Sequence, residues 1–334
     1  MKISRLSVLG AGSWGTALAM LAARNGLETL LWGHNATHVQ HLHKARSNAQ
    51  FLPGYEFPER LTVTDQMAEC ALFGDTFLVA VPSHAFRETL EKLAACCQDC
   101  RPNIAWATKG FSPEDESLLQ ETVYAIFGAT TPAAVLSGPS FALEVAAGLP
   151  TAITVAANRD DFAQAMAQVL HGGSFRAYTS CDMVGVQVGG AVKNVLAIAA
   201  GVADGLNFGA NTRAALITRG LHEILLLGLK LGGRQDTFMG LAGLGDLILT
   251  CTDDQSRNRR FGLALGQGKT PAQARQEINQ EVEGFSAALA AWRLAQRYRV
   301  DMPITEQTYK VLYEGQSPLA GVQNLLLREP KSET

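Results

Sequence analysis

A glycine-rich loop close to the N-terminus constrains the fold of this chain more than any other feature of its sequence. The loop, Gly10–Gly15 (GAGSWG), has G-x-G-x-x-G spacing, follows the apolar segment Leu6–Leu9 and precedes the helical pattern Ala17–Asn25. In a strand–loop–helix unit the first glycine permits the tight turn, the second lets a pyrophosphate approach the backbone, and the third lets helix and strand pack closely. The context predicts a dinucleotide-binding βαβ unit. The alternative is a glycine turn that binds no ligand.

The first half of the chain alternates short apolar segments with helical patterns, which is typical of βαβ units in a parallel sheet. After about Cys181 long helical patterns take over. We therefore predict an α/β fold, with an N-terminal Rossmann-type doubly wound sheet in residues 1–181 followed by an all-α C-terminal domain in residues 182–334. The predicted strands are Leu6–Leu9, Thr29–Trp32, Phe77–Val81, Ile104–Ala107, Ala134–Leu136, Ala152–Ala156 and Phe175–Tyr178. The predicted later helices are Gly185–Gly201, Asn211–Leu231, Gly262–Gly266, Pro271–Ile278, Ser286–Arg297 and Pro303–Tyr313.

The composition excludes several classes of protein. Of the 334 residues, 47% are hydrophobic and 18% are charged, which is too apolar for a disordered chain. The formal net charge of -3 leaves no basic surplus to neutralise phosphates, so nucleic-acid binding is disfavoured. No targeting signal precedes the first apolar strand. We expect a cytoplasmic protein with a small-molecule substrate, assembled as a homodimer.

The cysteines predict neither a disulfide framework nor a metal site. Cys97–Cys100 has CxxC spacing, but zinc would need a second pair at matched spacing, and the sequence has none. We interpret this segment as an incidental helix end in a reducing compartment. The six cysteines are Cys70, Cys96, Cys97, Cys100, Cys181 and Cys251.

The apolar segment Val184–Ala203 is long enough to cross a membrane but carries Lys193 near its centre. Inserting that lysine would cost about 2.5–3.5 kcal/mol, so we predict a helix buried within protein. Desolvation lowers the pKa of a buried lysine, which suits a proton acceptor near neutral pH. The alternative is a structural ion pair. Asn194, the next residue, can bind a substrate oxygen.

Three further segments carry candidate polar groups. Lys109 ends a predicted strand, at the edge of a parallel sheet where ligands bind. Asp246 follows the glycine-rich segment Gly240–Gly245. Ser256–Arg260 brings three arginines and two short polar groups together, and guanidinium groups bind phosphate bidentately. The alternative for this last segment is a solvated helix face.

The end of the second predicted strand bears on the choice of nicotinamide cofactor. A carboxylate there would bind the ribose 2′-hydroxyl and repel a 2′-phosphate, but His34 follows Trp32-Gly33 instead. NADP is therefore not excluded, and His34 can donate to its 2′-phosphate. We interpret His38, His41 and His43 as part of a solvated helix face. A metal site made by His34 and His38 is disfavoured, because no carboxylate or thiolate lies nearby in the sequence.

Eight motifs, in order, resemble the bacterial NAD(P)-dependent glycerol-3-phosphate dehydrogenase family. The resemblance extends from about Leu6 to Tyr313. Its motifs are Gly10–Gly15, Trp32–His34, Val81–His84, Ala107–Gly110, Ser137–Ala142, Gly189–Asn194, Gly243–Asp246 and Cys251–Asn258.

The resemblance implies reversible hydride transfer between NAD(P)H and dihydroxyacetone phosphate, giving sn-glycerol 3-phosphate for glycerophospholipid synthesis. It implies that Lys193 transfers the proton, Asp246 orients that lysine and Lys109 contacts the substrate beside the nicotinamide. Together with the glycine motif it places Gly10, Gly12, Ser13, Trp14, Gly15, His34, Lys109, Ala142, Arg257, Glu281 and Glu283 at the cofactor. It places Lys109, Gly138, Ser140, Lys193, Asn194, Asp246, Ser256, Arg257 and Asn258 at the substrate, with Gly138 and Ser140 also bordering the cofactor.

Two other functions fit part of the pattern. A β-hydroxyacid or 6-phosphogluconate-type dehydrogenase also joins a Rossmann domain to a helical domain with a helix-borne lysine. The Ser256–Asn258 motif after Gly243–Asp246 argues against it. A non-catalytic dinucleotide sensor would keep the glycine loop but would need neither Lys193 nor Arg257.

Overall fold

The computed structural model describes residues 1–97 and 101–328, so part of the Cys97–Cys100 segment, which we interpreted as an incidental helix end, lies outside the described residues. The chain divides into two compact units, residues 1–187 and 188–334. The division falls within one long helix. We retain the domain boundary after residue 181 as a proposal, which limited proteolysis would test.

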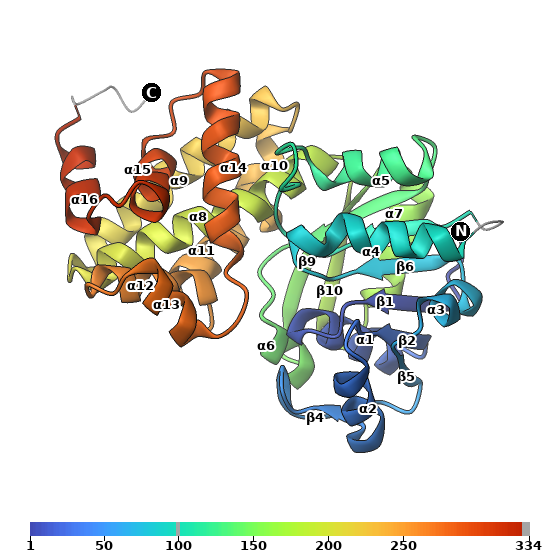
Figure 1. The fold of residues 1–334 in the computed structure, drawn as a ribbon. Helices are drawn as coiled ribbons and strands as arrows, with labels where there is room; N and C mark the ends of the chain where they lie inside the picture. Colours follow the sequence, from blue (N-terminus) through green and yellow to red (C-terminus); the bar gives the residue numbers. More distant parts are fainter. Residues whose placement is uncertain (98–100, 329–334) are drawn as a thin grey trace. The chain divides into compact units, whose positions relative to one another are not determined.

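The first unit is built on an eight-stranded sheet with the order β10-β9-β8-β7-β6-β1-β2-β5 (Figure 1). The order reverses beside β1, as in a doubly wound fold, and the predicted fold class is confirmed. Each predicted strand is present with ends shifted by no more than a few residues. The strands are β1 (Arg5–Leu9), β2 (Glu28–Trp32), β5 (Leu61–Thr64), β6 (Thr76–Val79), β7 (Asn103–Trp106), β8 (Ala133–Ser137), β9 (Thr151–Ala157) and β10 (Phe175–Ser180).

The sheet is not parallel throughout, which differs from the prediction. β9 pairs antiparallel with β8, and β10 pairs parallel with β9. The connection between β8 and β9 contains only the short helix α6 (Ala142–Ala147). A parallel crossover must carry the chain back along the strand, about 16 Å for five residues, whereas the six residues of α6 span only about 9 Å. An antiparallel strand can begin at the edge where the previous one ended.

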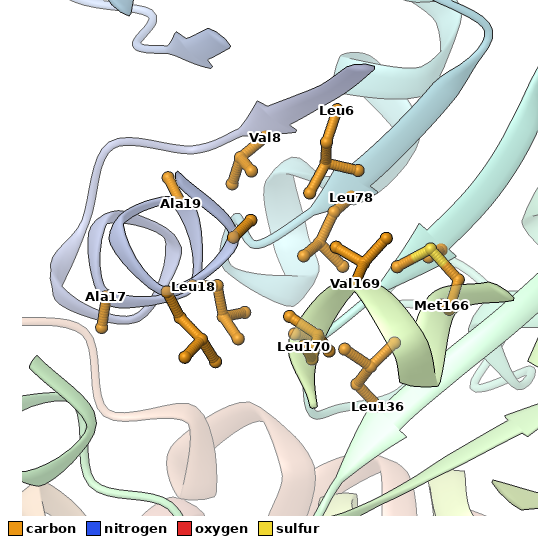
Figure 2. Close-up of a cluster of buried hydrophobic side chains, with 14 of the residues drawn as sticks. Leu6, Val8, Ala17, Leu18, Ala19, Leu78, Leu136, Met166, Val169 and Leu170 are labelled. Atoms are coloured by element: carbon orange, nitrogen blue, oxygen red, sulfur yellow. The ribbon is translucent and has the colours of Figure 1, made fainter. Parts of the chain in front are cut away.

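One hydrophobic cluster of the first unit lies between the sheet and two helices, α1 (Ser13–Arg24) and α7 (Asp160–Leu170). Figure 2 shows Leu6 and Val8 of β1 beside Leu78 of β6, with Leu18 of α1 and Leu170 of α7 facing them. This packing holds α1 against the carboxyl end of β1, so the intervening glycine loop is fixed at both ends. The remaining elements are α2 (Ala36–Ala45), α3 (Met67–Phe73), α4 (Ser83–Cys96), α5 (Leu119–Phe127) and the small hairpin of β3 (Ser47–Asn48) and β4 (Leu52–Glu56).

The second unit is helical throughout its described part, as predicted. Its core gathers Val195 and Ile198 with Phe261, Leu265 and Leu312. The helices are α8 (Met183–Gly205), α9 (Gly209–Lys230), α10 (Gln235–Met239), the π-helical turn η1 (Leu241–Gly245), α11 (Asp246–Thr252), α12 (Arg257–Gly266), α13 (Pro271–Ile278), α14 (Glu283–Tyr298), α15 (Pro303–Tyr313) and α16 (Pro318–Leu326).

Helix α8 is the one described helix long and apolar enough to cross a membrane. Of its apolar window, 89% is buried inside the protein. The prediction of a helix buried within protein is confirmed. Lys193 lies in the middle of this buried helix. A buried ammonium group needs a charged or hydrogen-bonding partner, because burial removes its hydration.

Candidate active site

The glycine loop after β1 contains three glycines, and the structural reason for glycine differs between these positions. Gly10 has a φ of +122°, and a Cβ there would lie 2.8 Å from the carbonyl oxygen of Ala80. A Cβ at Gly15 would overlap the carbonyl oxygen of Gly10. At Gly12, by contrast, an added Cβ would have nothing within 4 Å. Gly10 and Gly15 are therefore required by packing, whereas Gly12 faces open space that a ligand can approach.

The N-terminus of α1 is arranged to receive an anion. Gly12 is its N-cap residue, and no side chain among the described residues caps the helix. Its first turn, which includes Ser13 and Trp14, contains no acidic residue, so its backbone N–H groups and the positive end of the helix dipole are uncompensated. The buried indole Nε1 of Trp14 also has no hydrogen-bond partner among the described residues. Backbone N–H groups and an indole N–H in this position can donate hydrogen bonds to the pyrophosphate of a dinucleotide.

Asn48 fixes the glycine loop from a segment that sequence analysis did not single out. Its fully buried amide donates to the carbonyl oxygen of Ala11 at 3.0 Å and to Oγ1 of Thr16 at 2.8 Å. Its Oδ1 accepts from the backbone N–H of Phe51 at 3.2 Å and lies 3.2 Å from Nε2 of His38. Nothing in the local sequence around Ser47–Asn48 predicts this contact, because its partners lie 32 and 37 residues away.

The end of β2 carries an exposed histidine. His34 follows Trp32-Gly33, and Asn35 then caps α2 by accepting a hydrogen bond of 2.9 Å from the N–H of His38. His41 and His43 are exposed, in agreement with a solvated helix face, but His38 is partly buried beside Asn48. Within residues 1–97 and 101–328, no group of three or more His, Cys, Asp or Glu side chains could hold a metal ion.

The loops after β7 and β8 bring three predicted site residues to one carbonyl oxygen. Lys109 Nζ donates to the Gly138 oxygen at 3.2 Å, and Ser140 Oγ donates to the same atom at 2.9 Å. Gly138 has a φ of +150°, and a Cβ there would lie 2.9 Å from Cα of Ile153. Ala142 is the first residue of α6. These loops therefore present an ammonium and a hydroxyl at the carboxyl edge of the sheet.

Lys193 is the central residue of the second unit's polar cluster. Its side chain is 7% exposed, and Nζ donates to Oδ1 of Asp246 at 2.6 Å and to Oγ1 of Thr250 at 2.8 Å. Burial disfavours the ammonium form, whereas the adjacent carboxylate favours it. The apolar neighbours of Lys193 in the sequence indicate only the first effect. The ion pair that the sequence left open as an alternative is present.

Thr250 is a site residue that sequence reasoning missed. It lies one turn after Asp246 on α11, and its hydroxyl donates to the backbone oxygen of Asp246 at 2.6 Å. The (i, i+4) spacing from Asp246 was the available signal, because residues four apart share a helix face.

The glycine-rich segment before Asp246 forms a π-helical turn that approaches α8 closely. A Cβ at Gly189 of α8 would lie 2.6 Å from the carbonyl oxygen of Ala242, and a Cβ at Gly243 would overlap the backbone of Phe238. This approach delivers Asp246 to Lys193. Asp246 is the first residue of α11, which continues from η1 without a break, and its side chain is buried.

The first turn of α12 carries the predicted phosphate-binding residues. Ser256 is the N-cap residue, and its Oγ accepts from the backbone N–H of Arg259 at 3.2 Å. That hydroxyl can still donate its own hydrogen to a ligand. Burial lowers the pKa of the Arg257 guanidinium, and the carboxylates of Glu283 and Glu281 oppose this shift. Arginine remains a cation at neutral pH in such surroundings.

Asn258 connects this turn to the lysine-bearing helix. Its Nδ2 donates to Oδ1 of Asn194 at 2.9 Å, and its Oδ1 accepts from the N–H of Gly284 at 2.9 Å. A Cβ at Gly284 would lie 2.6 Å from the Asn194 carbonyl oxygen. The start of α14, which carries Glu283, is therefore packed against both asparagines.

The three arginines of Ser256–Arg260 do not act as one group, contrary to the expectation that they meet. Arg257 is half-buried and Arg260 is exposed. Arg259 is buried and forms ion pairs with Asp204 at 2.7 Å and with Asp254. Successive helical residues point about 100° apart, so they face different surroundings.

Comparisons with known proteins agree in both units. Family models described as NAD-dependent glycerol-3-phosphate dehydrogenase N-terminus and C-terminus match residues 5–163 and 182–323. The chain is 56% identical over 329 residues to a glycerol-3-phosphate dehydrogenase (NAD(P)+) of Methylococcus capsulatus, covering 98% of each chain. It is 53% identical to the Pseudoalteromonas translucida protein of the same name, covering 99% of this chain and 98% of that one.

The fold comparison gives the same result. A crystal structure of glycerol-3-phosphate dehydrogenase from Coxiella burnetii matches with a TM-score of 0.94 and 46% identity, covering 97% of this chain and 99% of the other. The glycine loop and Lys109 lie within the first family match, and Lys193, Asp246 and Arg257 lie within the second.

Proposed function

The chain belongs to the NAD-dependent glycerol-3-phosphate dehydrogenase family, and from that premise we propose how its own residues carry the reaction. The enzyme is an oxidoreductase that reduces dihydroxyacetone phosphate to glycerol 3-phosphate with NAD(P)H. When bound, the nicotinamide supplies or accepts the hydride. Everything else that the reaction needs must come from the protein.

Lys193 is the proton donor to the C2 oxygen of the ketone. As hydride reaches C2, the C2 oxygen gains negative charge, and a buried cation stabilises that charge more strongly than a solvated one would. Transfer of one proton from Nζ to this oxygen completes the alcohol and leaves a neutral amine. In the oxidation direction Nζ takes that proton back. The observation that carries this assignment is the buried contact of 2.6 Å between Lys193 Nζ and Asp246.

Asp246 and Thr250 hold the lysine in place. The hydrogen bonds from Nζ to Oδ1 of Asp246 and Oγ1 of Thr250 fix the direction in which the ammonium group points. The carboxylate also stabilises the ammonium that must form again after each turnover. We assign Lys109, in the first unit, to the substrate beside the nicotinamide.

Arg257, Asn258 and Ser256 bind the substrate phosphate at the start of α12. The first turn of this helix contains no acidic residue and offers backbone N–H groups along the helix dipole. A guanidinium and a hydroxyl add charge-assisted hydrogen bonds to the phosphate oxygens. Asn194 and Asn258, which are bonded to each other, are placed to order the substrate between the phosphate site and Lys193.

The first unit holds the cofactor. Gly10, Gly12, Gly15, Ser13 and Trp14 would receive the pyrophosphate, and His34 the adenosine ribose. We further propose that NADPH is used at least as well as NADH, because no carboxylate follows Trp32. We assign Gly138, Ser140 and Ala142 to the nicotinamide side. Glu281 and Glu283, beside Arg257, complete the proposed cofactor set.

The direct test is an assay of the purified protein with dihydroxyacetone phosphate, in which the nicotinamide absorbance is followed with NADPH and with NADH. Oxidation that depends on the phosphorylated ketone supports the proposed function. A β-hydroxyacid substrate that is turned over in its place would favour the related dehydrogenase class. Cofactor binding without turnover of either substrate would favour the sensor.

We also propose a cytoplasmic homodimer whose product enters glycerophospholipid synthesis. Free thiols support a reducing compartment, and the exposed side chains of Leu319, Leu326 and Leu327 provide apolar area for a second copy. Light scattering of the purified chain tests the dimer. Within the described part of the chain, the thiols of Cys70, Cys96 and Cys251 are free.

A further inference from the structure

Helices α8 and α12 meet with their backbones in contact. A Cβ at Gly201 of α8 would overlap the carbonyl oxygen of Arg259, and a Cβ at Gly262 of α12 would overlap that of Ile198. One turn later, a Cβ at Gly205 would lie 2.5 Å from the carbonyl oxygen of Leu263. Residues four apart share a helix face, so these glycines form one continuous contact. The first turn of α12 is therefore seated directly on α8.

A buried ion pair holds the same turn. Arg259 Nη2 lies 2.7 Å from Oδ2 of Asp204, which is the penultimate residue of α8. The two side chains are 10% and 11% exposed. The same carboxylate also contacts Arg213 of α9 at 3.0 Å, but that arginine side chain is 29% exposed. Asp204 thus joins α8 to α12 through a buried arginine and to α9 through a more exposed one.

The held turn is the one that carries the phosphate-binding residues. Arg257 and Asn258 directly precede Arg259, and Asn258 reaches back to Asn194, the neighbour of Lys193 on α8. A displacement of this turn would move the phosphate site relative to Lys193. Asp204 itself is eleven residues after Lys193 on α8, or about 16 Å along the helix axis, too far to touch the reacting carbonyl.

We propose that Asp204 is a positioning residue for substrate binding: through Arg259 it holds the first turn of α12 on α8, so that Arg257 and Asn258 meet the substrate phosphate. This inference rests on the proposed function of Arg257. Neutralising Asp204 leaves the Arg259 guanidinium buried without one of its carboxylates, which favours movement of that turn toward water. The substrate phosphate should lose contact, while the proton transfer at Lys193 remains intact.

The test compares Asp204→Asn with the matched control Arg213→Gln, which removes the other arginine on the same carboxylate. Steady-state KM and kcat are measured for dihydroxyacetone phosphate, and kcat/KM for unphosphorylated dihydroxyacetone, with Arg257→Ala as the reference. Complete loss of an arginine–phosphate contact weakens binding about ten- to a hundredfold. We expect a partial loss in Asp204→Asn, with KM raised about three- to tenfold, kcat within about threefold, and dihydroxyacetone unaffected.

The control and the conservative variant separate positioning from general stability. Arg213→Gln should change KM by less than about twofold. If Asp204→Asn does not fold, Asp204→Glu, which keeps the charge, should raise the same KM in the same direction by a smaller factor. A lowered Tm with unchanged KM, an equal loss with both substrates, or equal effects of Asp204→Asn and Arg213→Gln would overturn the inference. If Arg257→Ala itself fails to distinguish the two substrates, the phosphate assignment fails, and with it the proposed function of Arg257.

Discussion

The side-chain amide of Asn258 donates a hydrogen bond of 2.9 Å to Oδ1 of Asn194. This contact joins the first turn of α12, with Arg257 at its start, to the residue beside Lys193 on α8. It therefore links the proposed phosphate site to the proposed proton donor within one unit of the protein. Loss of Arg257 should weaken substrate binding, whereas loss of Lys193 should slow the chemical step.

Arg257→Ala should weaken substrate binding more than it slows hydride transfer. An arginine–phosphate contact exists in both the ground state and the transition state, so much of its energy is uniform binding. Its loss costs on the order of 1.5–3 kcal/mol. We expect KM for dihydroxyacetone phosphate to rise about ten- to a hundredfold, with a smaller fall in kcat because a loosely held substrate is less often aligned.

Unphosphorylated dihydroxyacetone is the control for Arg257. It should be a poor substrate of the parent and should lose little more in Arg257→Ala. Equal damage to both substrates would mean that Arg257 does not bind the phosphate, and the Ser256–Asn258 motif would have to be reassigned to the cofactor.

NADPH should support reduction at least as well as NADH. The physical reason is that no carboxylate follows Trp32 to repel a 2′-phosphate, while the exposed His34 can donate to it. The measurement is kcat/KM for each cofactor at saturating dihydroxyacetone phosphate. A hundredfold preference for NADH would contradict this reading of the β2 terminus.

Asn48→Ala should impair cofactor use and leave substrate binding unchanged. It removes the donors to Ala11 and Thr16 that hold the glycine loop, at a cost of about 1–3 kcal/mol in the free energy of unfolding. We expect a higher KM for both nicotinamide cofactors and an unaltered KM for dihydroxyacetone phosphate. The matched control is Asn35→Ala, which removes only the cap of α2 and should cost about 1 kcal/mol without a change in either KM. Indistinguishable cofactor KM values in the two variants would argue that Asn48 is merely structural.

Glu223 should make the stability of the protein depend on pH. Its buried carboxylate accepts from the N–H groups of Ile304 and Thr305 at the start of α15, at 2.6 and 3.0 Å. Burial raises the pKa of Glu223 from 4.5 to about 7, although these hydrogen bonds oppose the shift. A raised folded-state pKa gives stability that is present below pH 4.5 and is lost as pH rises through 7.

The measurement is the free energy of unfolding of the parent and of Glu223→Gln between pH 4.5 and 8. Relative to the variant, the parent should lose up to about 3 kcal/mol as pH rises across this interval. Parallel pH profiles would show that Glu223 has the same proton affinity in the folded and unfolded chains.

The sequence predicts the fold well where the signal is local. The continuous apolar strands and the loop Gly10–Gly15 lie where expected, because a buried strand must be apolar and a tight turn needs glycine. β5 was missed because it is a four-residue edge strand with an exposed Thr62. The antiparallel direction of β9 was missed because it depends on the short helix in the preceding connection and not on the strand itself.

For the proposed site, the sequence indicates candidate residues, but it does not indicate how their side chains contact one another. The burial of Lys193 follows from its apolar neighbours, but its contact with Thr250 depends on a π-helical turn that forms only where Gly189 admits close packing. The three arginines of Ser256–Arg260 were expected together, and the predicted helix began at Gly262. α12 begins at Arg257, and its helical twist directs Arg259 to Asp204 instead.

The central claim is that Lys193 transfers the proton, and Lys193→Met tests it most directly. Methionine keeps the length and apolar stem of the lysine but cannot donate. Reductase turnover with dihydroxyacetone phosphate and NADPH is measured together with NADPH binding by fluorescence titration, so that a misfolded variant is recognised. We predict that kcat falls about 10²–10⁴-fold, the usual scale for a general acid, while NADPH binding is preserved. A folded variant that binds NADPH and keeps near-normal turnover would contradict the account and leave the Lys193–Asp246 pair as a structural ion pair.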